Sequence, residues 1–172
     1  MTDRGCPPGD GCAPTAGRRP HRVSVIGAGD ASAGELALAE ALGRALGKAG
    51  VVVVTGGLGG VMEAASRGCV EAGGTTVGYL PGADPSEANS WVSIPLATGL
   101  GETRNSLVVR AGEAVVAVGG GWGTLSEIAL AKKMGREVAL LGISTLDLSL
   151  PRLETAAAAA EWALKAAASD AG

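Results

Sequence analysis

The residues of this chain best suited to chemistry lie in the stretch AVGGGWGTLSE, residues 117–127. An apolar run leads there into a glycine-rich loop, and the loop leads into a predicted helix start. Glycines let a backbone approach an anion closely, and the free amides of a helix N-terminus attract negative charge. The stretch therefore predicts a phosphate-binding loop made of Gly120, Gly121, Trp122, Gly123 and Thr124. A tight strand-to-helix turn without a ligand is the alternative interpretation.

Glu127, which follows this loop, has two interpretations. The spacing Thr124-x-x-Glu127 matches a capping box, in which the glutamate accepts a hydrogen bond from the backbone amide of the cap residue. A carboxylate beside a phosphate site could instead face the sugar of a nucleotide. There it would stabilise an oxocarbenium-like transition state or orient water. The two roles are compatible only where one carboxylate oxygen stays free.

Arg104 strengthens the case for a bound anion. It falls in the first turn of a predicted helix, where a positive charge opposes the helix macrodipole by roughly 0.3–1 kcal/mol. An anion held between Arg104 and the glycine-rich loop would explain this placement. A salt bridge to Glu102 or a solvated side chain is the alternative. Trp122 would stack on a base, shield the phosphate or pack in a subunit contact.

Composition narrows the chemistry further. The single histidine, His21, leaves no imidazole cluster for zinc and argues against a Ser-His-Asp or Cys-His nucleophile. The three cysteines, Cys6, Cys12 and Cys69, are an odd number that does not indicate a disulfide framework. We expect no metal site, with a thiol pair at Cys6 and Cys12 as the alternative. Acid–base chemistry would then use carboxylates, hydroxyls or lysines.

Charge and hydropathy limit the partners. The net charge is −3 at pH 7 and no dense Lys/Arg face is evident, which argues against nucleic acid. No run approaches the roughly 18 apolar residues of a membrane span, and the N-terminus has no apolar signal-peptide segment. We therefore expect a cytoplasmic protein that binds neither nucleic acid nor membrane.

The elements that would position these residues alternate regularly. Short apolar runs predict strands at 23–26, 51–55, 75–80, 114–118 and 137–141, with a further short strand at 92–96. Helical periodicity predicts helices at 35–48, 60–72, 102–111, 125–134 and 153–168. This alternation indicates a single-domain α/β fold over residues 21–172, a doubly wound parallel sheet with helices on both faces. Residues 1–20, rich in glycine and proline, are predicted to be a flexible tail.

Ligands bind to such sheets beyond the carboxyl ends of the strands, where the strand order reverses. The loops at those ends are dense in glycine, and Asn105 lies beside Arg104. They supply the remaining candidate ligand-binding residues, which are Gly27, Gly29, Gly56, Gly57, Gly59, Gly60 and Asn105. Two common nucleotide motifs are disfavoured. Ser32 stands where the dinucleotide fingerprint needs its third glycine, and Glu35 stands where a Walker A sequence needs lysine.

Three segments together resemble a known group of proteins. GGGWGTLSE is similar to the motif PGGxGTxxE of the LOG cytokinin-activating phosphoribohydrolases, which are often labelled lysine decarboxylases. VVVTGGLGGVMEAASRG and TGLGETRNSLVVR resemble more closely a sister branch, the DprA-related proteins that include the molybdenum-cofactor carrier proteins. The resemblance covers residues 22–142. It implies a Rossmann-like fold, a homo-oligomer, and a nucleotide or pterin phosphate held at the glycine-rich loop.

The resemblance also implies an enzymatic activity. In LOG enzymes the motif glutamate and an upstream arginine serve cleavage of the bond between base and ribose 5′-monophosphate, and by match these are Glu127 and Arg104. The chain departs from that pattern, because Gly119 replaces the motif proline, Ser126 replaces the first acidic residue and GETRN replaces the arginine segment. Decarboxylation by pyridoxal phosphate is rejected, because no lysine lies in a strand-end loop.

Two functions follow. The first is binding of a small phosphate-bearing ligand, a nucleoside monophosphate or a molybdopterin-type cofactor, with no further cofactor required. The second is an N-glycosidase that acts on AMP or cytokinin riboside 5′-monophosphates, with Glu127 and Arg104 as catalytic residues. An oligomeric scaffold with an unused loop is the plainest alternative.

Overall fold

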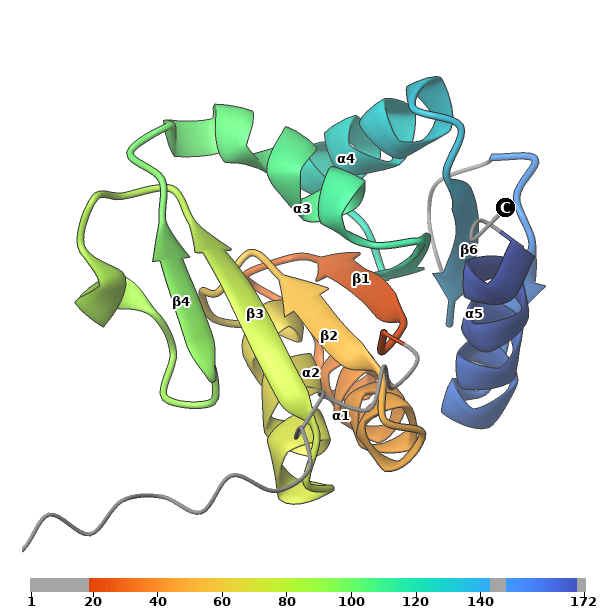
Figure 1. The fold of residues 1–172 in the computed structure, drawn as a ribbon. Helices are drawn as coiled ribbons and strands as arrows, with labels where there is room; N and C mark the ends of the chain where they lie inside the picture. The colour runs from red at the N-terminus through yellow and green to blue at the C-terminus, as the bar shows by residue number, and fades with distance from the viewer. Residues whose placement is uncertain (1–18, 143–147, 170–172) are drawn as a thin grey trace, which may run out of the picture.

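A parallel sheet forms the centre of the molecule (Figure 1). The computed structural model describes residues 19–142 and 148–169. Within them the strands are β1 (Arg22–Gly27), β2 (Val52–Thr55), β3 (Thr75–Leu80), β4 (Ile94–Ala97), β5 (Ala114–Val118), β6 (Glu137–Leu141) and β7 (Arg152–Leu153). They lie in the order β4-β3-β2-β1-β5-β6-β7. The chain first builds outward from β1 to β4 and then adds β5 on the other side of β1. The strand order therefore reverses between β1 and β5.

Helices cover both faces of the sheet (Figure 1). One face packs against α1 (Ala33–Lys48), α2 (Val61–Glu71) and α5 (Ala156–Ser169). The other packs against α3 (Asn105–Ala111) and α4 (Trp122–Lys133). The short 3-10 turns η1 (Pro85–Glu87) and η2 (Gly101–Arg104) follow β3 and β4. All five residues of β5 are buried, as expected for a strand covered on both sides.

The two N-terminal helices cross at very short distance. A Cβ placed on Gly43 of α1 would lie 2.0 Å from the carbonyl oxygen of Ala65, and one on Gly68 of α2 would lie 2.0 Å from that of Glu40. Only glycine permits this approach. Charged side chains beside the crossing are paired, with Arg44 Nη2 2.9 Å from Glu40 Oε1 and 2.6 Å from Glu71 Oε2.

The predicted fold class is confirmed: a doubly wound parallel sheet with helices on both faces. The weak strand predicted at 92–96 exists as the edge strand β4. The last helix begins at Ala156 rather than at 153, because Arg152–Leu153 pairs with β6 as an additional edge strand that the sequence did not predict. The α4 helix begins at Trp122 rather than at 125.

Several expectations fall outside the described residues. They are the flexible tail up to residue 18 and, within it, the thiol pair Cys6 and Cys12. In the ranges 19–142 and 148–169, no helix combines the length and the apolar character that crossing a bilayer requires. The cytoplasmic location stays a prediction.

Candidate functional site

A pocket of about 340 Å³ lies at the carboxyl ends of β1, β2 and β5, where the strand order reverses. This is the place at which open α/β sheets bind ligands. The pocket is lined by Ile26, Gly27, Ala28, Gly29, Gly56, Leu58, Met62, Glu102, Arg104, Asn105, Gly121, Gly123, Thr124 and Glu127. Its volume falls in the range of small-molecule sites.

The N-terminus of α4 forms one wall of the pocket. The helix begins at Trp122 after Gly121, and no side chain caps its first turn. The first amides of an α-helix have no intrahelical acceptor, so they are available to a ligand. A Cβ placed on Gly29, Gly121 or Gly123 would meet no atom within 4 Å. These three glycines therefore border open space rather than a packed neighbour.

The capping box predicted at Thr124 and Glu127 is wrong. Because α4 begins earlier than predicted, Thr124 lies inside its first turn and Glu127 lies one turn further along. A glutamate there cannot reach back to the residue that precedes the helix. The capping box of this chain stands elsewhere, at Ser32 and Glu35, at the start of α1. The carboxylate of Glu127 is left to line the pocket.

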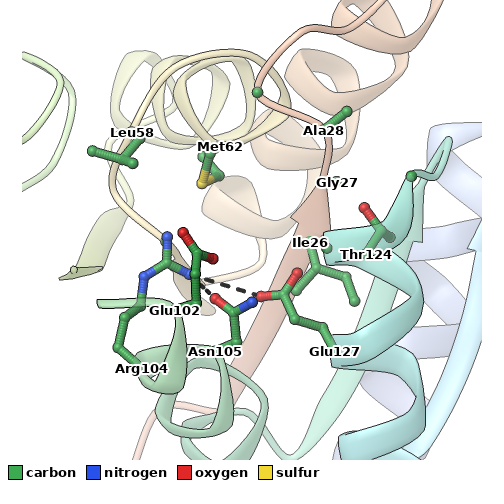
Figure 2. A pocket seen from close by; sticks show the side chains of 14 residues that line it. Ile26, Gly27, Ala28, Leu58, Met62, Glu102, Arg104, Asn105, Thr124 and Glu127 are labelled. Atoms are coloured by element: carbon green, nitrogen blue, oxygen red, sulfur yellow. Dashed lines mark hydrogen bonds and ion pairs between the residues drawn. The ribbon is translucent and has the colours of Figure 1, made fainter. Parts of the chain in front are cut away.

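Arg104 enters the pocket from the end of η2, opposite α4 (Figure 2). It is only 7% exposed. Its Nη1 donates a hydrogen bond to Oδ1 of Asn105 and lies 4.0 Å from Oε1 of Glu127. Its Nε is buried and has no hydrogen-bond partner among the described residues. Burial lowers the pKa of Arg104, while Glu127 and Glu102 oppose that shift.

Gly56 makes room for this arginine. A Cβ at Gly56 would stand 2.7 Å from Nη2 of Arg104 and 2.7 Å from Sδ of Met62. The loop after β2 thus has to lack a side chain where the guanidinium packs against it. Asn89 fixes the same loop, since its Nδ2 donates to the carbonyl oxygens of Gly57 at 3.1 Å and Leu58 at 2.8 Å.

Glu127 is also only 7% exposed. Burial raises the pKa of its carboxyl to about 7, Arg104 lowers it in part, and Glu102 raises it further. The carboxyl is therefore present in both protonation states near neutral pH. The ion pair that Arg104 forms within the described chain is with Glu127 and not, as one alternative had it, with Glu102. Figure 2 shows Asn105 lying between the two charged groups.

The structure brings most of the predicted residues together at this pocket. Those that line it are Gly27, Gly29, Gly56, Arg104, Asn105, Gly121, Gly123, Thr124 and Glu127. Five predicted residues do not line it, namely Gly57, Gly59, Gly60, Gly120 and Trp122. Gly57 and Gly60 adopt positive φ and pack closely on neighbouring chain, so their glycines serve the loop itself. Trp122 is 88% exposed and does not line the pocket.

The sequence did not single out the apolar lining. Ile26, Ala28, Leu58 and Met62 lie at or near the predicted glycines and form the uncharged part of the wall. Their positions beside the glycines at the strand ends were the available signal. Without a known sheet order, that signal does not say which neighbours of a glycine face the ligand.

Two departures from the LOG pattern have a structural explanation. Gly119 has φ +65°, which proline cannot adopt because its ring fixes φ near −65°. Ser126 is exposed and its hydroxyl donates to the carbonyl oxygen of Gly123 at 2.7 Å. Neither residue lines the pocket.

Comparisons with known proteins agree with this architecture. The family model described as SLOG cluster4 family matches residues 20–168. An uncharacterised protein of Archaeoglobus fulgidus is 41% identical over 120 residues, which span 70% of this chain and 79% of the relative. The solved structure of the molybdenum cofactor binding protein of Rippkaea orientalis is similar at a TM-score of 0.81 and 34% identity, covering 86% of this chain and 98% of that one.

The molybdenum cofactor carrier protein of Chlamydomonas reinhardtii is similar at a TM-score of 0.79 and 36% identity, covering 87% of this chain and 99% of that one. These matches confirm the family to which the three sequence segments point.

Proposed function

Because the chain belongs to the SLOG cluster4 family, and because of the geometry of its pocket, we propose that it binds a small phosphate-bearing ligand. The ligand is a nucleoside monophosphate or a molybdopterin-type cofactor. The observation that carries the proposal is the pairing of an uncapped helix N-terminus with a buried arginine across one pocket. Arg104 Nε has no partner there among the described residues, and the α4 amides have no side-chain cap.

The two features favour an anion for separate reasons. The α4 N-terminus supplies unpaired amides and the positive end of the helix macrodipole. Arg104 supplies a full charge that burial keeps from water. Leaving a buried donor unpaired costs about 1–3 kcal/mol, more for a charged group, and a ligand acceptor would recover that cost. The open glycines allow a phosphate to come close to the backbone.

A molybdopterin-type ligand is supported by the proteins from Rippkaea orientalis and Chlamydomonas reinhardtii, both described by the molybdenum cofactor they bind or carry. The residues of the pocket suit such a group. Its phosphate would lie at Gly121 to Thr124, and its heterocycle would lie against Leu58 and Met62. No cofactor is needed for the proposed binding itself.

Calorimetric titration with AMP, GMP and inorganic phosphate tests the proposal, with adenosine and guanosine as unphosphorylated controls. We expect the phosphorylated compounds to bind and the nucleosides to bind more weakly. A ligand at one hundred times its Kd should raise the free energy of unfolding by about 2.7 kcal/mol. The same series includes a single-stranded oligonucleotide, because the net charge of the chain and its lack of a dense Lys/Arg face argue against a nucleic-acid partner. We expect the oligonucleotide not to bind.

The variant Gly121→Leu should abolish this binding, because its side chain would fill the space beside the α4 amides. Gly121 has extended backbone angles that leucine accepts, so the fold should persist. Gly34→Leu is the matched control. Gly34 is equally open but lies at the start of α1 and does not line this pocket. Equal binding by the two variants would contradict the proposal.

A second function is favoured by one observation, the burial of Glu127 beside the pocket. A carboxyl with a pKa of about 7 can act as general acid or base near neutral pH. An N-glycosidase would use the ionised carboxyl to accept a proton from the water that attacks the ribose carbon. The bond from that carbon to the base breaks, and the leaving base takes up a proton from solvent. Release of free base from AMP or a cytokinin riboside 5′-monophosphate, lost in Glu127→Gln, would support this activity. Binding without release would exclude it.

Self-association is also part of the proposal. The edge strand β4 exposes Ile94 and Leu96, and Leu100 nearby is 50% exposed. Exposed edge strands pair readily with another chain. Light scattering should give a mass above that of one chain, and Leu96→Lys should lower it. An unchanged mass for Leu96→Lys would place the contact elsewhere.

A further inference from the structure

The side chains at the inner end of the pocket point to a preference for one class of heterocycle. We infer that Glu127 and Arg104 together read the edge of a 2-amino-4-oxopyrimidine ring, as found in guanine and in pterins, while the α4 N-terminus holds the phosphate. This inference rests on the proposed function and names the ligand class of the same site.

The 2-amino-4-oxopyrimidine ring has a distinctive hydrogen-bonding edge. Its edge presents an amino group and a ring N–H, both donors, followed by a carbonyl oxygen, an acceptor. A carboxylate accepts two parallel hydrogen bonds, and a guanidinium only donates. A carboxylate can therefore accept from the amino group and the ring N–H, while a guanidinium beside it donates to the carbonyl oxygen. Adenine does not match, because its edge presents an amino donor beside an unprotonated ring nitrogen.

The pocket supplies both groups at a suitable separation. Oε1 of Glu127 and Nη1 of Arg104 are 4.0 Å apart, which is beyond hydrogen-bond distance. Each can therefore make a closer contact with a third group. Both residues are only 7% exposed, so their contacts with a ligand would form away from water. In Figure 2 the two side chains come from α4 and η2 and converge at one side of the pocket.

Asn105 orients the arginine for this role. It accepts a hydrogen bond from Nη1 of Arg104, so part of the guanidinium is fixed by the protein. Nε, which is buried, retains a donor without a partner among the described residues. Leu58 and Met62 line the same pocket and offer apolar contact to the face of a ring. The site thus combines a polar edge, an apolar wall and, at α4, an anion site.

Titrations of the full chain with GMP, AMP and 6-hydroxymethylpterin phosphate test the inference. GMP and the pterin phosphate should each bind at least about tenfold more tightly than AMP, which is the discrimination expected of one well-formed bidentate contact. The tighter of the two identifies the source of the ring, nucleotide or pterin. Equal affinity for AMP and GMP, with AMP binding lost in Gly121→Leu, would overturn the inference and leave the proposed function standing. No binding by any of the three would overturn both.

The variant Glu127→Gln should lose the preference for GMP over AMP, because an amide oxygen offers only one of the two acceptors. Glu63→Gln is the matched control, since Glu63 lies on α2 outside the pocket lining. It should keep the preference. An unchanged ratio of GMP to AMP affinity in Glu127→Gln would overturn the inference.

The pH dependence gives a second readout. Only the ionised carboxyl accepts both hydrogen bonds, and the charged groups that act on it are Arg104 and Glu102, both at η2. The ratio of GMP to AMP affinity should therefore fall as the pH drops below about 7, while the shared phosphate cancels from the ratio. A ratio independent of pH would contradict the role of Glu127.

Discussion

The crossing of α1 and α2 and the pocket at the carboxyl ends of the strands use the same residue types in opposite ways. Both are rich in glycine and both contain arginine and glutamate. At the crossing, the glycines are in contact with backbone, and the charged side chains are paired near solvent. In the pocket, three glycines border open space, and the arginine and glutamate are buried.

The difference separates residues that hold the fold from residues available to a ligand. A glycine that touches backbone is there for packing, and a paired surface charge adds little to stability. A glycine beside open space and a buried arginine without a full set of partners do not improve the packing of the free protein. The ligand proposed for this pocket would explain both, because it would fill the space and complete the hydrogen bonds.

The largest expected effect comes from closing the helix crossing. Gly43→Ala would place its Cβ 2.0 Å from the carbonyl oxygen of Ala65 and should lower the free energy of unfolding by about 3 kcal/mol or more. Gly121→Ala, at the pocket, should change it by less than about 1 kcal/mol. Urea unfolding measures both. Similar losses in the two variants would remove the distinction between packing and binding glycines.

The next effect concerns the buried carboxyl. Glu127 keeps its proton to about pH 7 in the folded chain, whereas its ordinary pKa is 4.5. Unfolding therefore releases a proton between these values, and the free energy of unfolding falls as pH rises through that window. The glutamine of Glu127→Gln cannot ionise, so the variant lacks this pH dependence. The free energy of unfolding of the variant minus that of the unaltered chain should therefore increase by about 2–3 kcal/mol from pH 4 to pH 8.

Denaturant unfolding of both chains at several pH values measures that difference. Glu63→Gln is the control for the substitution itself, because Glu63 lies on α2 outside the pocket lining. A stability difference between Glu127→Gln and the unaltered chain that stays constant with pH would mean that folding does not shift the pKa of Glu127.

A smaller loss of stability is expected at Gly56, which both packs against Arg104 and lines the pocket. Gly56→Ala would press on the guanidinium of Arg104 and on Sδ of Met62, two flexible groups that can move. We expect a cost of about 1–2 kcal/mol in the free energy of unfolding and a loss of phosphate-ligand affinity of about tenfold. Thermal unfolding and calorimetric titration measure the two. Unchanged affinity would show that the position of Arg104 does not matter for the ligand.

The smallest effect should come from the surface pairs at the crossing. Arg44→Met removes the ion pairs with Glu40 and Glu71 and keeps much of the aliphatic side chain. The midpoint of thermal unfolding should drop slightly at low salt, and the difference should shrink in high salt as the charges are screened. A loss comparable to that of Gly43→Ala would mean that the charges, not the glycines, hold the crossing.

The sequence predicted the sheet because its central strands are buried on both faces and read as continuous apolar runs. The sequence did not predict the edge strand Arg152–Leu153, because two residues are too few to form a recognisable apolar run. For the site, the spacing of Thr124 and Glu127 suggested a cap, whereas the glycines before Trp122 allowed α4 to start earlier. Whether a glycine faces open space depends on residues in other loops. The local sequence around a glycine therefore could not predict which glycines line the pocket.

A crystal structure of the chain with bound GMP would show directly where the phosphate is held. We expect phosphate oxygens within hydrogen-bond distance of the backbone amides at Gly121 to Thr124 and a ligand acceptor near Nε of Arg104. A phosphate bound away from the α4 N-terminus, with Arg104 Nε still unpaired, would contradict it.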